Sequence, residues 1–313
     1  MEIVAGFSEI KKIEKAVITI GTFDGVHKGH FDILNTLNQT AKKENVASCV
    51  ITFDPHPQKV VSKNFELKLL STLDEKIKLI KEFGVDNVIV IKFDRDLANL
   101  TAEEFLQKLI DSGIGIKHII VGYDHGFGKN RSGNEEQLRI LGKKIDFSVT
   151  RVGAVKLNED GISSTKIRRA LLDEGDVTKA ASYLGRYYNI EGKVVKGARR
   201  GRQLGFPTAN IDADYPDKLI PKKGVYCISS EINGKKFYGI MNIGMRPTFN
   251  DVSNYVIEVH FLDFDFDIYG KKIKVEIIER IRDEVKFETK SELINQITRD
   301  KAACRELMKK VTN

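Results

Sequence analysis

The fold of the first half is indicated by AVITIGTFDGVHKGH, residues 16 to 30. An apolar, β-branched run ends in a glycine-containing turn, and a helical pattern follows from about Lys28 to Lys43. This order predicts a phosphate site, because glycines allow close approach and a helix start offers unpaired N–H groups to anions. His27 and His30 are three residues apart, so both imidazoles can face one ligand and donate hydrogen bonds to a phosphate.

The same alternation continues outward from this stretch to about residue 152. Further apolar strands are predicted at 46–53, 86–93, 118–122 and 147–152. The intervening helices are predicted near 71–83, 101–111 and 134–144. Strands rich in Val and Ile that alternate with helices indicate an α/β fold, a Rossmann-like parallel sheet covered on both faces. Ligands of such a sheet bind beyond the carboxyl ends of its strands.

From Tyr187 onward the pattern changes to β-rich segments. Asn233-Gly234 between two β-branched runs is a strong hairpin signal. A last helical stretch runs from about Thr289 to Val311. We therefore expect a small antiparallel β-barrel with a terminal helix, and two domains that cover residues 1–185 and 186–313.

Length and charge limit the class of protein. A chain of 313 residues exceeds what one hydrophobic core usually fills. Of the net charge of +7, residues 1 to 185 carry +1 and the remainder carries +6. A basic half fits either polyphosphate or nucleic acid. Basic tracts interleaved with exposed aromatic residues are missing, which disfavours nucleic acid.

The cysteines and the apolar runs indicate the compartment. Cys49, Cys227 and Cys304 are odd in number, far apart and form no CxxC, which argues against a disulfide framework and a zinc knuckle. The first 15 residues do not resemble a signal peptide, and no apolar run reaches the roughly 20 residues that a membrane span needs. The sequence predicts a soluble protein of the reducing cytoplasm.

The turn carries a resemblance to a known family. GTFDGVHKGH (21–30) resembles the GxFDGxHxGH form of the HxGH motif in the nucleotidylyltransferase superfamily. Its Phe-Asp-Gly is similar to the adenylylating domain of the bacterial riboflavin kinase/FMN adenylyltransferases, which are bifunctional FAD synthetases. Three more segments agree with that family and follow predicted strands: TFDPHP (52–57), VGYDHGFGKNRSG (121–133) and GISSTKIRRAL (161–171).

This resemblance implies roles at the first site. His27, His30 and Arg168 become the catalytic residues that stabilise charge on a phosphate. Nucleotide binding is implied for Gly21, Phe23, Asp24, Gly25, Gly29, Ser164 and Thr165. Flavin binding is implied for Asp54, Asp124 and Phe127, although His125 stands where the family has an aromatic residue. Without the resemblance, the Asp residues fit turns and the Ser-Thr segment fits a capped surface helix.

A second site is indicated by GARRGRQLGFPTAN, residues 197 to 210. It is not a P-loop, because no GKS or GKT closes it, and GARRGR alone fits a basic hairpin loop. GRQLGFPTAN, however, resembles the riboflavin kinase signature GRxLGFPTAN. The resemblance implies that Mg²⁺ is held by Thr208 and Asn210, whose neutral oxygens lie on one strand face. It implies nucleotide binding by Gly197, Arg202, Gly205 and Pro207.

Two later segments extend this second resemblance. In SNYVIEVHFLDFDFDIYG (253–270), Glu258 matches the family's catalytic glutamate, the base for a hydroxyl nucleophile. MNIGMRPTF (241–249) also matches and implies that Asn242 and Arg246 contact the flavin; alone it fits a strand and a Pro-containing turn. We interpret the acidic run from Asp263 to Asp267 as turn residues, because the Gly and Glu of a calcium loop are missing.

Together these motifs predict a bifunctional transferase. The barrel would phosphorylate riboflavin to FMN with ATP and Mg²⁺, and the first domain would adenylylate FMN to FAD, releasing pyrophosphate. Riboflavin, FMN and ATP are the expected partners, with neither nucleic acid nor membrane, and the sequence leaves the oligomeric state open. One alternative retains only one activity, such as riboflavin kinase alone. Another is a basic nucleic-acid-binding regulator.

Overall fold

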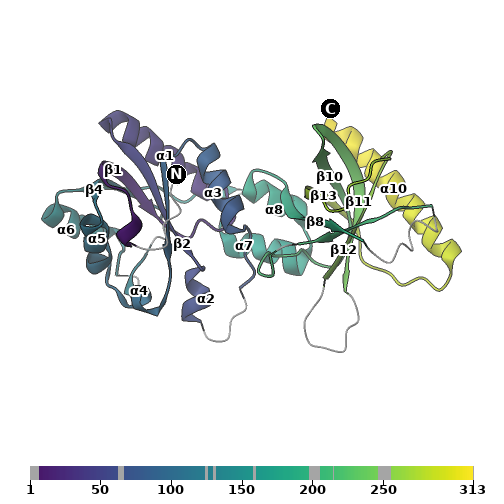
Figure 1. Cartoon of the computed structure of the whole chain (residues 1–313), viewed down its shortest axis with the longest axis horizontal. Helices are drawn as coiled ribbons and strands as arrows, with labels where there is room; N and C mark the ends of the chain where they lie inside the picture. The colour runs from purple at the N-terminus through teal and green to yellow at the C-terminus, as the bar shows by residue number, and fades with distance from the viewer. Residues whose placement is uncertain are drawn as a thin grey trace. The chain divides into compact units, whose positions relative to one another are not determined.

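The computed structural model describes residues 7–62, 67–123, 126–129, 132–157, 160–196, 205–213, 215–245 and 255–312 (Figure 1). The chain divides into two compact units, Met1–Ser164 and Thr165–Asn313. The division by function at residues 185 and 186 stays a prediction.

The first unit is built on a five-stranded parallel sheet. Its strands are β1 (Ile13–Ile20), β2 (Ala47–Asp54), β3 (Asn87–Lys92), β4 (Ile114–Val121) and β5 (Ser148–Arg151). They lie in the order β3-β2-β1-β4-β5. The predicted α/β sheet is confirmed. The order reverses between β1 and β4, which is where such sheets bind ligands.

Helices cover both faces of this sheet. They are α1 (Lys28–Glu44), α2 (Pro57–Val61), α3 (Leu73–Glu82), α4 (Arg95–Asn99), α5 (Ala102–Asp111) and α6 (Glu135–Ile145). A 3₁₀ turn (Phe7–Glu9) precedes β1, and a short hairpin of β6 (Lys156–Leu157) and β7 (Asp160–Gly161) follows β5. Val17 packs in one core with residues of α1 and α3, whereas Ile18 packs in the other with residues of α5 and α6. Burial on both faces explains why the strands are apolar without alternation.

The second unit contains a closed six-stranded antiparallel barrel. Its strands are β8 (Tyr188–Val195), β9 (Ala209–Asp212), β10 (Gly224–Ile232), β11 (Lys235–Met245), β12 (Tyr255–Phe261) and β13 (Lys272–Arg282). They close in the order β10-β11-β12-β9-β8-β13. Asn233 and Gly234 both have positive φ, 53° and 75°, between the paired Ile232 and Lys235. The predicted hairpin and the barrel with its terminal helix are therefore confirmed.

Three helical segments accompany the barrel in the chain. They are α7 (Ser164–Arg169), which spans the division between the units and continues as a π-helical turn (Ala170–Glu174), then α8 (Val177–Leu184) and α10 (Lys290–Thr312). On α10, the buried Asp300 carboxylate accepts hydrogen bonds from Nε and Nη2 of Arg282 on β13, at 2.8 to 3.1 Å. This charge-assisted bidentate pair fixes the helix on the barrel.

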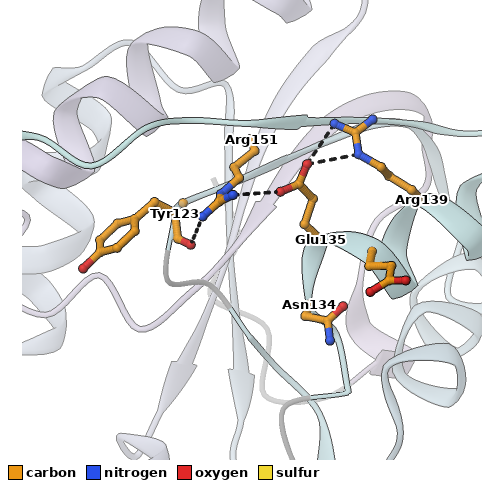
Figure 2. Close-up of a pocket in the computed structure, with 7 residues that line it drawn as sticks. Tyr123, Asn134, Glu135, Arg139 and Arg151 are labelled. Carbon is orange, nitrogen blue, oxygen red and sulfur yellow. Dashed lines mark hydrogen bonds and ion pairs between the residues drawn. The ribbon is translucent and has the colours of Figure 1, made fainter.

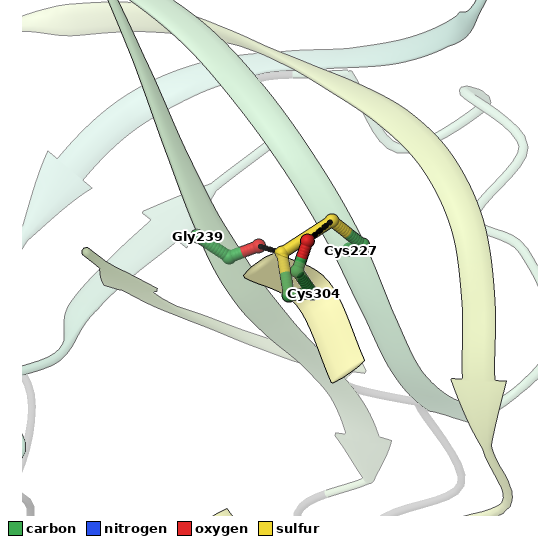
Figure 3. The surroundings of a disulfide bond; sticks show 3 residues. All are labelled: Cys227, Gly239 and Cys304. Carbon is green, nitrogen blue, oxygen red and sulfur yellow. Dashed lines mark hydrogen bonds between the residues drawn. A yellow bond between two sulfur atoms is a disulfide. The ribbon is translucent and has the colours of Figure 1, made fainter. Parts of the chain in front are cut away.

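A disulfide also joins α10 to the barrel. Cys227 on β10 is bonded to Cys304 on α10, and the Cys304 sulfur lies 3.3 Å from the Gly239 carbonyl oxygen of β11 (Figure 3). The sequence-based argument against a disulfide was wrong for this pair. Spacing along the chain could not show it, because the packing of α10 brings together residues that are 77 positions apart. Cys49 is a buried free thiol.

Among the residues that the structure describes, no helix is long and apolar enough to cross a bilayer.

Candidate active sites

The turn after β1 has an unusual backbone. Phe23, Gly25 and Val26 have positive φ angles of 49°, 78° and 37°. Left-handed conformations are costly for Phe and for β-branched Val, so surrounding contacts must hold them. A Cβ added at Gly21 would lie 3.0 Å from Cε2 of Phe23, which accounts for a glycine at the end of the strand.

Asp24 fastens this turn to the segment that leads into α3. Its buried carboxylate accepts hydrogen bonds from the N–H groups of Leu70 and Ser71, both at 3.1 Å. The Ser71 hydroxyl also contacts that carboxylate at 3.3 Å and accepts from the Gly25 N–H at 3.0 Å. These contacts are with the protein, and the nucleotide-binding roles of Gly21, Phe23, Asp24 and Gly25 stay predictions.

The two histidines stack at the start of α1. His27 is the N-cap residue and His30 is three residues further, with ring centroids 3.7 Å apart and planes inclined by 14°. The His27 N–H donates to Nδ1 of His30 at 3.2 Å, which places the proton of a neutral His30 ring on Nε2. A Cβ at Gly29 would lie 3.0 Å from the His27 ring, so glycine makes room for it. The structure thus brings both predicted catalytic histidines together as possible donors.

The GISST segment also reaches the turn. The Ser164 hydroxyl donates to the Asp24 carbonyl oxygen at 2.9 Å. Thr165 and Arg168 follow on α7, in the second unit. Their roles in the first site stay predictions.

Lys76 was missed by the sequence analysis. It lies with Ile77 and Ile80 on the buried side of α3, and its side chain reaches the carboxyl ends of β1 and β2. Its Nζ donates to Thr22 O at 3.2 Å, Thr52 Oγ1 at 3.0 Å and Phe53 O at 3.2 Å. Burial lowers the pKa of Lys76 to about 8, against the opposing charges of Asp24 and Asp54. A lysine inside an apolar stripe of a predicted helix was the signal that could have revealed it.

The residues predicted to contact flavin in this unit come from separate segments of the chain. Asp54 is the last residue of β2. Phe127 packs edge-on against Phe105, with centroids 5.5 Å apart, beside the core that includes α5. Asp124 and His125 lie outside the described residues. The flavin-binding roles of Asp54, Asp124 and Phe127 stay predictions.

A cavity of about 400 Å³ opens beyond the carboxyl ends of β4 and β5 (Figure 2). It is lined by Gly122, Tyr123, Asn134, Glu135, Glu136, Arg139 and Arg151. Glu135 pairs with Arg139 at 3.0 Å and with Arg151 at 3.3 Å. Arg151 also donates to the Tyr123 carbonyl oxygen at 2.8 Å. These arginines give the cavity a polar, partly cationic wall that the sequence analysis did not single out.

The second candidate site is a row across three strands of the barrel. Glu258 on β12 pairs with Asn210 on β9 and with Asn242 on β11. Side chains of directly paired residues point to the same face, with Cβ atoms typically about 4.5–5.5 Å apart. All three are partly buried. The ladder therefore places three predicted site residues next to one another, although they come from separate sequence segments.

The segment before β9 is tied to this row. Thr208 immediately precedes β9, and Gly205 has a φ of 82°. The Pro207 carbonyl oxygen accepts a hydrogen bond from Nδ1 of His260 at 2.8 Å. His260 lies on β12 two residues after Glu258, and burial lowers its pKa. His260 is thus a supporting residue that the sequence analysis missed.

The other predicted residues of the second site are Gly197, Arg202 and Arg246, which lie outside the described residues. Within the described part of the chain, no group of three His, Cys, Asp or Glu residues could hold a metal ion. Asp267 accepts a hydrogen bond from the Tyr269 N–H at 2.9 Å, as an Asp in a turn does.

Comparison with known proteins separates the chain into the same two parts. Residues 9–166 match the FAD synthetase family model, and residues 184–308 match the riboflavin kinase model. The chain is 37% identical to the bifunctional riboflavin kinase/FMN adenylyltransferase of Bacillus subtilis, over 92% of this chain and 90% of that protein. The enzyme of the same name from Escherichia coli K12 is also 37% identical, over 98% and 97%.

A solved structure is similar over the whole chain. A crystal structure described as a macrolide-efflux protein from Streptococcus pneumoniae has a TM-score of 0.88 and 32% identity. The match covers 97% of this chain and 98% of that one.

Proposed function

Since this chain belongs to the family of bifunctional riboflavin kinase/FMN adenylyltransferases, we propose how its residues divide the two reactions. The protein is a transferase that phosphorylates riboflavin with ATP and then adenylylates the resulting FMN with ATP to give FAD. The barrel performs the first reaction, and the unit with the parallel sheet performs the second. The observation that carries this assignment is the row of Asn210, Glu258 and Asn242.

In the barrel, Glu258 is the base for riboflavin phosphorylation. It accepts the proton of the riboflavin 5′-hydroxyl as that oxygen attacks the γ-phosphorus of ATP, and ADP leaves. Asn242, across the ladder from Glu258, orients the flavin. Gly197, Arg202, Gly205 and Pro207 contact ATP. Arg246 contacts the flavin.

Thr208 and Asn210 would hold Mg²⁺ in this site. The fit rests on their donor atoms: a hydroxyl and an amide oxygen lie two residues apart in sequence, Asn210 is paired with Glu258, and Mg²⁺ prefers oxygen ligands. When bound, the ion neutralises charge on the phosphates. The segment that carries Thr208 is held to β12 by the bond between Pro207 and His260.

In the first unit, the FMN phosphate attacks the α-phosphorus of ATP and pyrophosphate leaves. The phosphate is already an anion, so this nucleophile needs no general base. His27, His30 and Arg168 stabilise the charge that develops on the transferred phosphorus oxygens. No covalent enzyme intermediate forms. Asp54, Asp124 and Phe127 contact the flavin, and the remaining predicted residues of the turn and of α7 contact ATP.

We place the enzyme in the cytoplasm, because both of its reactions consume ATP, which is made there. The disulfide between Cys227 and Cys304 is the feature that runs against this compartment, because cytosolic disulfides are rare. Thiol alkylation in intact cells, followed by mass spectrometry, measures the state of this pair. A fully oxidised pair there contradicts a reducing compartment.

The decisive test is incubation with riboflavin, ATP and Mg²⁺, with separation of the flavins by chromatography. Accumulation of FAD through FMN supports both reactions. Formation of FMN alone supports only the kinase activity. If neither FMN nor FAD forms, the proposed function is wrong. A parallel incubation with FMN, ATP and Mg²⁺ isolates the second reaction.

A further inference from the structure

Lys76 combines burial with a full set of partners. The residue is 8% exposed, and its ammonium makes three hydrogen bonds, to Thr22 O, Thr52 Oγ1 and Phe53 O. Three donors thus meet three acceptors, which is the full capacity of a lysine. Thr22 belongs to the turn after β1, whereas Thr52 and Phe53 belong to the end of β2.

Burial of the Lys76 ammonium costs free energy, because the charged group loses its hydration. None of the three partners is a carboxylate, so the loss of solvation is offset by neutral hydrogen bonds and by the charges of Asp24 and Asp54, without a contact ion pair among the described residues. An apolar side chain in an apolar pocket would serve packing at lower cost. A cation at this point therefore indicates a requirement beyond stability.

Lys76 connects the turn after β1 to the end of β2, and this turn leads to the two histidines. The turn that begins at Gly21 includes positive φ angles at Phe23 and Val26 and ends at the stacked His27 and His30. Asp24 anchors the middle of this turn through Ser71, and Lys76 anchors its start through Thr22. The two residues that bind the turn from outside are Ser71, which lies just before α3, and Lys76, which lies on α3.

We propose that Lys76 is a positioning residue for FMN adenylylation, because its ammonium fixes the β1 turn against the end of β2 and thereby fixes His27 and His30. The inference rests on the proposed function of this site. Misplacing catalytic groups by about 1 Å can cost about 10²-fold in rate, and that loss falls on kcat when the groups act in the transition state.

The main test is Lys76→Met, which keeps a long apolar stem and removes the ammonium. We expect kcat for FMN adenylylation to fall about 10²-fold. The KM values for FMN and ATP should change less than about threefold, since the loss falls on an interaction made in the transition state. Riboflavin kinase activity of the same molecules should be unchanged, which reports that the barrel is folded, and the retained KM values report the same for the first unit. Unchanged kcat for adenylylation, or a loss confined to KM, overturns the inference.

A second pair of variants avoids dependence on one substitution. Thr52 is fully buried, and Thr52→Val removes its Oγ1 at nearly constant volume, whereas Thr52→Ser keeps the hydroxyl. We expect Thr52→Val to lower kcat and Thr52→Ser to retain it within about twofold. The double variant Lys76→Met/Thr52→Val should be no slower than Lys76→Met alone, because residues in contact are not additive. If the two losses in kcat add fully in the double variant, Lys76 and Thr52 do not act through their common hydrogen bond, and the inference is overturned.

His30→Ala, assayed in parallel, separates this inference from the function on which it rests. If His30→Ala keeps full adenylylation, the proposed site is wrong. If His30→Ala loses adenylylation and Lys76→Met does not, only the role of Lys76 is wrong.

Discussion

The two sites of this enzyme place their polar groups by different means. In the first unit, the histidines end an irregular turn. Its own Asp24 binds the segment before α3, and Lys76 and Ser164 contact the turn from other segments. In the barrel, Asn210 and Glu258 are set opposite each other by strand register alone. The comparison teaches that the first site depends on side chains beyond its catalytic groups, whereas the second depends on backbone pairing. Substitutions should therefore affect the two activities through different residues.

The largest expected effect is the loss of riboflavin kinase activity, without loss of FMN adenylylation, in a variant of the barrel. Glu258→Ala removes the base, so we expect FMN formation to fall by about 10²–10⁴-fold. Conversion of supplied FMN to FAD should be unchanged. Both rates are measured by chromatography of the flavins, with Glu276→Ala on β13 as a control for loss of a barrel carboxylate. Kinase turnover at the wild-type rate would remove Glu258 from the role of base.

The converse experiment uses the first unit. His30→Ala removes one preorganised donor, which should slow adenylylation by about 10²-fold while sparing riboflavin phosphorylation. The assay supplies FMN for one reaction and riboflavin for the other. An equal loss of both activities in a folded variant contradicts the independence of the two sites.

A smaller effect tests whether the contacts of Asp24 with the segment before α3 hold the turn. Asp24→Ala leaves the N–H groups of Leu70 and Ser71 without their carboxylate acceptor, so we expect the free energy of unfolding of the first unit to fall by about 2 kcal/mol. Hydrogen exchange of peptides from α3 and β1 measures it. Asp32→Ala on α1 removes an exposed carboxylate and serves as the matched control. Equal protection in the two variants would show that Asp24 does not fasten the turn.

The same contrast explains what could be predicted from the sequence. The parallel sheet, the barrel and the Asn233-Gly234 hairpin followed from hydrophobic periodicity and turn chemistry, which are local properties. His27 and His30 could be paired by their spacing, since three residues bring side chains together on a helix. Glu258 was placed near Asn210 only through the family resemblance, because strand register between distant segments leaves no local signal.

Two sets of contacts could not be predicted because they depend on tertiary packing. The apolar stripe around Lys76 indicates that it is buried, but its partners are fixed only when α3 packs against the strand ends. Cys227 and Cys304 meet only because α10 lies on β10 and β11. In each case the partner is supplied by an element tens of residues away.

The smallest effect concerns the buried charge itself. Burial lowers the folded-state pKa of Lys76 to about 8, below the ordinary lysine value of 10.5, so between these values the unfolded chain binds more protons than the folded one. Stability must then rise with pH, and we expect a gain of about 1 kcal/mol in the first unit between pH 7 and pH 9. Urea unfolding followed by circular dichroism measures it.

Lys76→Met is the matched control for this pH dependence, because it removes the titrating group and should remove the gain. Burial raises the pKa of Cys49 to about 12 from 9.0, which opposes the gain at higher pH. That contribution is shared by both proteins and cancels in their difference. If wild type and Lys76→Met show the same slope, Lys76 carries its charge in the folded state as an exposed lysine does. The Lys76 ammonium would then keep its hydration in the folded state, and the difference between the two sites would rest on the contacts of Asp24 and Ser164.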